Sequence, residues 1–145
     1  MKIRFVAAFA AVFSAIGIFL SSNFQTTESA GFINSRCAIA SFRSAYRQSK
    51  AVFVGEVVSE EKDEDTKTFK FEVKEYWKGA DTKNIEINVY ETTRYQAWFQ
   101  KGGKYLIYAT ADEDGKLRVE RCSRSRDAAN AAEDLRQLGK GKIPR

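Results

Sequence analysis

The hydrophobic and polar positions between Ala51 and Glu120 follow the two-residue period of β-strands. The run 51–58 is almost continuously apolar, which predicts a strand buried on both faces, and Gly55 within it predicts a bulge or tight bend. Strict alternation predicts two half-buried strands, one from Phe69 through Val73 to the Lys78-Gly79 pair and one over 85–89. A fourth and a fifth strand are predicted at 104–109 and 117–120.

Turn signals separate these runs. The acidic stretch 60–65 contains no apolar residue and predicts an exposed loop, and 112–115 predicts a hairpin turn between the last two strands. Five short strands with turns at near-regular intervals predict a small closed or sandwich β-domain.

Two short helices are predicted to flank the strands. Phe42, Ala45 and Tyr46 have helical spacing within 41–49. The second helix begins at an N-cap, Ser125 or Asp127, and ends at Gly139. Its predicted packing face is small and apolar, which favours a core role over ligand contact, and consists of Ala128, Ala131, Ala132, Leu135 and Leu138.

The N-terminus has the pattern of a targeting segment. Lys2 and Arg4 precede an unbroken run of apolar and small residues, 5–20. As a helix this run would be roughly 24 Å long, shorter than the ~30 Å hydrocarbon core of a bilayer. We therefore expect residues 1–30 to be a cleaved signal peptide and residues 31–145 to form one secreted, periplasmic or extracellular domain. The cleavage motif near Ala30 is weak, so an uncleaved anchor is the alternative.

The chain contains two cysteines, Cys37 and Cys122. In an oxidising compartment they are expected to form a disulfide that joins the start of the domain to its end.

The composition argues against an enzyme. The chain has no histidine, which excludes Ser-His-Asp and Cys-His nucleophile systems and histidine-ligated metal sites. No glycine-rich phosphate loop is present, and the carboxylates lie in loops or on polar strand faces. We expect no catalytic residues, no cofactor and no metal. The net charge of +5 is modest and the signs are mixed along the chain, which indicates a solvated surface rather than a nucleic-acid platform.

Several short motifs occur in an order that resembles a known family. They are Cys37 followed by the predicted helix, Val-Phe-Val-Gly-Glu-Val at 52–57, Phe-Glu-Val through Lys-Gly at 71–79, Phe-Gln-Lys-Gly-Gly-Lys-Tyr-Leu at 99–106, and Cys-Ser-Arg at 122–124. Over about 35–138 the chain resembles the tissue-inhibitor-of-metalloproteinases-like family, whose module is shared with netrin C-terminal domains. The resemblance implies a mainly β fold: a five-stranded OB-fold barrel with a short N-terminal helix and a C-terminal helix packed on it.

The resemblance also implies how this chain departs from the inhibitors. Their first mature residue is a disulfide-bonded cysteine whose free amine and carbonyl oxygen chelate the zinc of the protease. The Ala-x-x-Ser sequence after Cys37 aligns Cys37 with the second cysteine of a Cys-x-Cys start, so Ser35 stands at the chelating position. The usual partner of the first cysteine, expected near Tyr95, is also absent. Cys37 keeps its expected partner, Cys122.

Zinc chelation by Ser35 would require cleavage directly before it. Asn34 and Phe32 make a poor signal-peptidase site, so we expect residues to precede Ser35 and to block its amine. Inhibition by the animal mechanism is not expected.

We expect a secreted protein-binding module, with an extracellular or periplasmic metalloprotease or another protein as partner. One candidate contact element is the segment Ser35, Arg36, Cys37, Ala38 and Ile39, and the other is the loop 91–99, which contains Tyr95, Trp98 and Phe99 and follows Tyr90. The alternative for these rings is that they cap one end of the barrel.

Two other functions stay open. An OB-fold could bind an acidic polysaccharide or single-stranded nucleic acid through the basic residues near the C-terminus, namely Arg121, Arg124, Arg126, Lys140 and Lys142. Secretion, modest charge and interspersed acidic residues argue against nucleic acid. The third function is an outward-facing structural domain of the cell envelope, which would be held at the membrane only if the signal segment is not cleaved.

Overall fold

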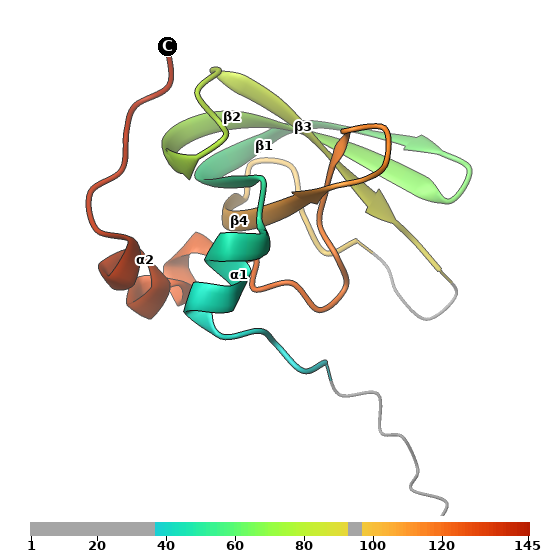
Figure 1. Cartoon of the computed structure of the whole chain (residues 1–145). Helices are drawn as coiled ribbons and strands as arrows, with labels where there is room; N and C mark the ends of the chain where they lie inside the picture. Colours follow the sequence, from blue (N-terminus) through green and yellow to red (C-terminus); the bar gives the residue numbers. More distant parts are fainter. Residues whose placement is uncertain (1–36, 93–96) are drawn as a thin grey trace, which may run out of the picture. The chain divides into compact units, whose positions relative to one another are not determined.

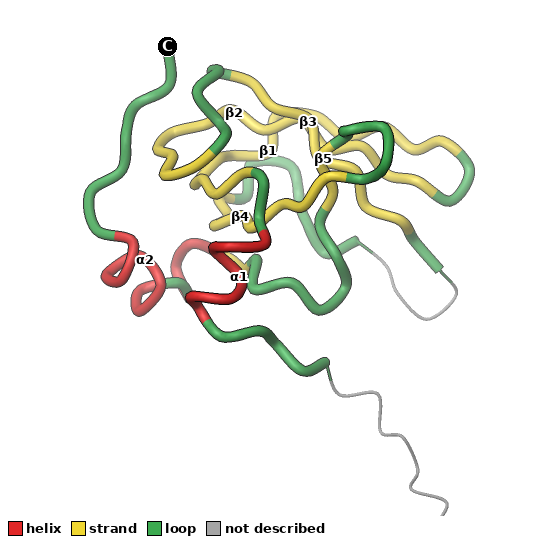
Figure 2. The backbone as a smooth tube through the Cα atoms, viewed as in Figure 1, coloured by secondary structure: helices red, strands yellow, loops and turns green. Residues whose placement is uncertain are grey.

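The computed structural model describes residues 37–92 and 97–145. The chain forms strands flanked by short helices (Figures 1 and 2). In chain order the elements are α1 (Phe42–Gln48), β1 (Ala51–Asp63), β2 (Thr66–Lys78), β3 (Asn84–Tyr90), β4 (Lys104–Ala111), β5 (Leu117–Arg118), β6 (Arg126–Asp127), the 3-10 helix η1 (Ala128–Asn130) and α2 (Ala132–Leu138).

Five strands form a ring within one sheet. The order is β1-β2-β3-β5-β4, and β4 also pairs with β1. The pairs are antiparallel except for β3 with β5, which meet through Asn88 and Arg118. β6 pairs with β4 at Tyr105 and Leu106. The predicted mainly β architecture of five strands with two helices is therefore confirmed.

Gly55 lies at an irregularity of β1. The pairing of β1 with β2 shifts register between Val54 and Gly55, as the glycine in an apolar strand predicts. A Cβ on Gly55 would lie 3.0 Å from the ring of Phe53 and 3.2 Å from the carbonyl oxygen of Glu72. Glycine is therefore needed where these groups approach closely.

The loop predicted for 60–65 is wrong as secondary structure, although its exposure is confirmed. β1 continues through Asp63 and pairs with β2 as far as Asp63 with Thr66, so only Glu64 and Asp65 make the turn. Residues 60–65, all of them charged, are exposed. Cross-strand pairing with β2 stabilises the extended backbone here without apolar burial.

The hydrophobic residues of β1 and β4 pack on two sides. The larger core lies on one side and includes Phe53, Phe69, Phe71, Ile87 and Ile107. The smaller core lies on the other side, where Val52, Leu106 and Tyr108 pack against Ala45 of α1 and Ala131, with Leu135 and Leu138 of α2 partly buried. The apolar pattern of 51–58 thus reflects burial on both faces, as expected.

α1 begins and ends as predicted, whereas the C-terminal helix ends at Gly139 as predicted but begins later than expected. Ser41 caps α1 by accepting a hydrogen bond from the Ser44 amide. Asp127 caps only η1, through the Ala129 amide, and the non-helical backbone at Ala131 separates η1 from α2. The expected packing face is also partly wrong, because Ala132 is exposed and Asp134 is buried instead.

The C-terminal tail lies along the end of β2. Lys142 forms two backbone hydrogen bonds with Tyr76, each 2.8 Å long. The Gly141 amide donates to Glu75 Oε1 at 2.6 Å, and the Arg145 amide donates to the carbonyl oxygen of Asp81. The tail is therefore fixed beside β2 by main-chain hydrogen bonds and by the carboxylate of Glu75.

Within 37–92 and 97–145, no helix has the length and apolar character needed to cross a membrane. The predicted signal peptide, residues 1–30, lies outside the described residues.

Candidate functional site

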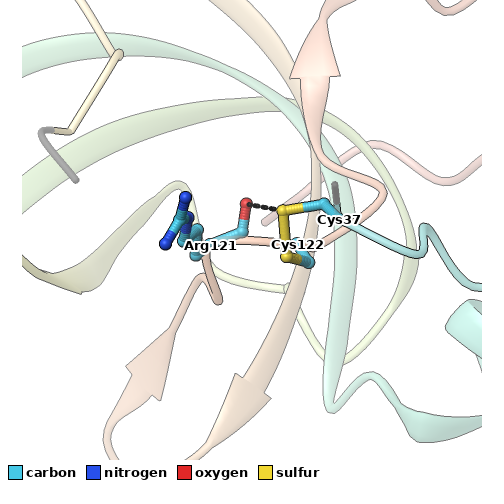
Figure 3. Close-up of a disulfide and its surroundings, with 3 residues drawn as sticks. All are labelled: Cys37, Arg121 and Cys122. Carbon is cyan, nitrogen blue, oxygen red and sulfur yellow. Dashed lines mark hydrogen bonds between the residues drawn. A yellow bond between two sulfur atoms is a disulfide. The ribbon is translucent and has the colours of Figure 1, made fainter. Parts of the chain in front are cut away.

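The first candidate contact element, apart from Ser35 and Arg36, lies at the start of the described chain. Cys37 forms the predicted disulfide with Cys122, with 5.1 Å between the Cα atoms (Figure 3). The carbonyl oxygen of Arg121 lies 3.9 Å from Cys37 Sγ. A disulfide sulfur carries no hydrogen, so this approach is a contact rather than a hydrogen bond. The disulfide is typical of extracellular and periplasmic proteins.

The other end of this element is also fixed. Arg124 donates from Nη1 to the carbonyl oxygen of Ala40 at 3.1 Å, and Ser41 then caps α1. Between the two fixed points, Ala38 and Ile39 are exposed, with Ile39 at 55%. The segment Cys37–Ile39 therefore presents an apolar side chain from a backbone that is attached to the domain at both ends.

The Arg124 side chain is itself held by a buried acid. Its Nε and Nη2 donate to the two carboxylate oxygens of Asp134 at 2.7 and 2.6 Å, the bidentate geometry of the strongest ion pairs. The Asp134 side chain is 1% exposed and that of Arg124 is 17% exposed. Tyr108 of β4 also donates to Asp134, at 3.1 Å. One carboxylate on α2 thus positions the guanidinium that binds Ala40.

This arrangement changes the acidity of its members. Burial, followed by the adjacent carboxylate of Asp134, raises the pKa of Tyr108. Hydrogen bonding to Asp134 raises the pKa of Arg124. Arg124 stays charged and Tyr108 stays protonated, so both remain donors to Asp134.

The segment after Cys122 is fixed to β4 by hydroxyl groups. Ser125 Oγ accepts from the Tyr108 amide at 2.8 Å, and Ser123 Oγ accepts from the Ser125 amide at 3.1 Å. The backbone on both sides of Arg124 is therefore held in place. The disulfide and the guanidinium both extend from this fixed segment to the stretch before α1.

The second candidate contact element is the loop 91–99. Phe99 is buried in the larger core, where its ring meets those of Phe69 and Tyr105 edge-on at 5.2 and 5.0 Å. Trp98 is 38% exposed and lies against Phe99, with ring centroids 4.3 Å apart. Tyr95 lies outside the described residues. Of the two described rings, Trp98 is the one that offers surface to a partner.

Glu91 closes the base of this loop. Its Oε1 accepts from the Ala97 amide at 2.8 Å, and its Oε2 binds Lys62 Nζ of the β1–β2 hairpin at 3.1 Å. The hydrogen bond from Ala97, together with Lys62, holds the pKa of Glu91 below its usual value. The loop and the hairpin are thereby joined through one buried carboxylate. These contacts are separate from those that hold Cys37–Ile39.

The basic residues near the C-terminus have different roles in the structure. Arg124 is paired with Asp134, and Arg126 donates from Nε to the carbonyl oxygen of Arg124. Lys142 binds β2 through its backbone. Across the described part of the chain, no cluster of three or more acidic, cysteine or histidine side chains could hold a metal ion.

The structural importance of Asp134 escaped the sequence analysis. The sequence signal that could have shown its burial is the position of Asp134 between Ala131 and Leu135, on the helix face that was expected to pack. A charged residue is rarely fully buried unless it is paired, so its position called for a cationic partner.

Comparison with known proteins gives no family for this chain. No protein-family model matches it, and no curated protein matches it.

Proposed function

We propose that this protein is a secreted, disulfide-braced protein-binding module of the tissue-inhibitor-of-metalloproteinases-like type, built on an OB-fold barrel, and that it contacts its partner through the segment Cys37–Ile39. Two observations support the fold. The strands form a closed ring, preceded in the chain by α1 and followed by α2, and the motifs occur in the order typical of the family.

One observation carries the binding role. Cys37–Ile39 is exposed and has no regular structure, yet the disulfide to Cys122 fixes one end and Arg124 fixes the other through Ala40. A loop that is ordered before binding loses little conformational entropy on association, so more of the contact free energy appears as affinity. An exposed isoleucine on such a segment is suited to enter an apolar pocket of a partner.

The partner class follows from the resemblance and is a zinc metalloprotease outside the cytoplasm. Without a cysteine at position 35, binding by this module relies on side-chain and main-chain contacts of 37–39 rather than on chelation. The protein would occupy the surface around the protease cleft.

The experiment measures binding of the secreted chain to immobilised thermolysin. Ile39→Asp is expected to weaken binding about ten-fold, because burial of a large aliphatic side chain contributes roughly 1.5 kcal/mol or more. Ile143→Asp is the matched control, since Ile143 is 74% exposed and lies in the tail. Equal effects of the two substitutions, or no binding by the parent chain, would contradict the proposal.

N-terminal sequencing of the secreted protein tests the absence of chelation. A start upstream of Ser35 agrees with binding through 37–39 alone. A start at Ser35, combined with inhibition that acetylation of the amine abolishes, would show that the zinc-chelating mechanism operates instead.

A further inference from the structure

A groove lies between α1 and α2, and no residue of the segment Cys37–Ile39 lines it. One part has a volume of about 580 Å³ and a second, smaller hollow has a volume of about 190 Å³. Phe42, Tyr46 and Gln137 line both parts, so we treat them as one feature, the α1–α2 groove. The two helices lie side by side in Figure 1. The remaining lining residues are Ser41, Arg43 and Arg124 in the larger part and Trp77 and Leu138 in the hollow.

The floor of the groove is aromatic and fixed. The rings of Phe42 and Tyr46 stack with centroids 6.3 Å apart. Tyr46 donates its hydroxyl to the carbonyl oxygen of Trp77 at 3.3 Å, and Trp77 donates from Nε1 to that of Gly139 at 3.0 Å. The polar atoms of Tyr46 and Trp77 thus have hydrogen-bond partners within the protein, so these two rings offer mainly apolar surface to the groove. All three rings are partly exposed.

The hollow has the size of one side chain. Its volume is about 190 Å³. It therefore suits a single aliphatic or aromatic side chain of an occupant.

Basic side chains beside the groove have no carboxylate partner, although Lys78 Nζ donates to the carbonyl oxygens of Tyr46 and Arg47. Arg43 lines the groove, and Lys78 Nζ lies 5.4 Å from the centroid of the Tyr46 ring. Among the described residues, no carboxylate lies within 4.0 Å of the charged nitrogens of Arg43, Arg47 or Lys78. Arg124, by contrast, is already neutralised by Asp134. An occupant with negative charge beside an apolar side chain would complement this surface.

We propose that the α1–α2 groove binds an acidic peptide segment of a partner protein, with one apolar side chain in the hollow and flanking carboxylates toward Arg43. A peptide fits the lining better than an acidic sugar does. Sugar hydroxyls need several hydrogen-bond partners, whereas the only side-chain amide in the groove, Gln137, already donates to Glu133. This site is independent of the function proposed for Cys37–Ile39.

The test is an NMR titration of the full secreted chain, labelled with ¹⁵N, with the capped peptide acetyl-Asp-Glu-Phe-Glu-Asp-amide. The chain has two tryptophans, so the indole N–H signals provide an internal comparison. The Trp77 signal is expected to shift in a saturable way, while the Trp98 signal stays in place. Replacing the phenylalanine of the peptide by alanine, or its acids by lysine, is expected to weaken binding at least five-fold.

Variants separate the local charge from the total charge. Arg43→Glu is expected to weaken binding about five-fold or more, since an attractive surface pair becomes repulsive. Lys101→Glu makes the same change in net charge. Lys101 precedes the start of β4, where Lys104 pairs with Glu56, and it does not line the groove, so this substitution should have no effect. Three results would overturn the proposal: no shift of Trp77, equal weakening by both variants, or an equal response to a tetrasaccharide of uronic acid, which would assign the groove to sugars.

Discussion

The buried ion pair between Arg124 and Asp134 makes a strong prediction about stability. Replacing Asp134 alone by leucine leaves the Arg124 guanidinium and the Tyr108 hydroxyl without their acceptor in a place where Asp134 is 1% exposed. Replacing all three residues by apolar ones, Arg124→Met, Asp134→Leu and Tyr108→Phe, removes every polar group of the set together. The carbonyl oxygen of Ala40 also loses its donor, but Ala40 is only partly buried and water can take that place.

The expected magnitudes differ between the two variants. Loss of one partner of a buried pair costs about 3–5 kcal/mol, and the 17% exposure of Arg124 places this case near ~3 kcal/mol. The triple variant should lie within about 1 kcal/mol of the parent, because the desolvation cost of the charges disappears along with their attraction. The single substitution should therefore be more damaging than the triple one.

Urea unfolding followed by tryptophan fluorescence, with the disulfide intact, measures both free energies. Arg136→Gln is the control, because the Arg136 pair with Glu133 on α2 is exposed and should contribute little. A loss below 1 kcal/mol for Asp134→Leu, or an equal loss for the triple variant, would refute the account of this pair. Amide exchange in the triple variant should also be faster around Ala40, since the guanidinium no longer binds there.

Two further predictions concern the other fixed points. Glu91→Gln should be less stable than the parent at pH 7, and the difference should shrink as the pH falls below about 4.5, the usual pKa of Glu. The folded-state pKa of Glu91 is lowered, so the stability that its carboxylate contributes is present above the unfolded pKa and is lost as the pH falls through the folded pKa. A difference in stability that stays constant between pH 7 and pH 3 would argue against this role. Replacing Cys37 and Cys122 by serine together should lower the unfolding free energy by roughly 4–5 kcal/mol, because the disulfide joins residues 85 positions apart. Equal midpoints of urea unfolding for the parent and the double variant would contradict that estimate.

Much of the strand arrangement could be predicted because burial determined the pattern. Alternation at Phe69, Phe71 and Val73 and the continuous run from Ala51 both correspond to core faces of β1 and β2. The outer half of the first hairpin could not be predicted in this way. Residues 60–65 are charged and exposed, and only pairing between the strands extends β1 through Asp63.

The candidate site was less predictable than the fold. The disulfide followed from the number of cysteines, and the candidate segment before α1 followed from the family that the motifs resemble. The support for that segment from α2 depends on contacts between Arg124, Asp134 and Ala40, which lie up to 94 positions apart in the chain. No local period or spacing signals such an interaction. Phe99 illustrates the opposite case, since an aromatic residue in a loop was equally consistent with core packing, and its ring is buried.

The pairing of the C-terminal tail with β2 affects how chains meet one another. β3 accompanies β2 only from Thr66 to Glu72, so the later residues of β2 have an edge that β3 does not cover. An uncovered strand edge is a template on which a second molecule can add a strand and begin aggregation. Lys142 occupies both main-chain groups of Tyr76 on this stretch. Residues 141–145 therefore cover part of a strand edge to which a second molecule could otherwise add, a role separate from either proposed binding surface.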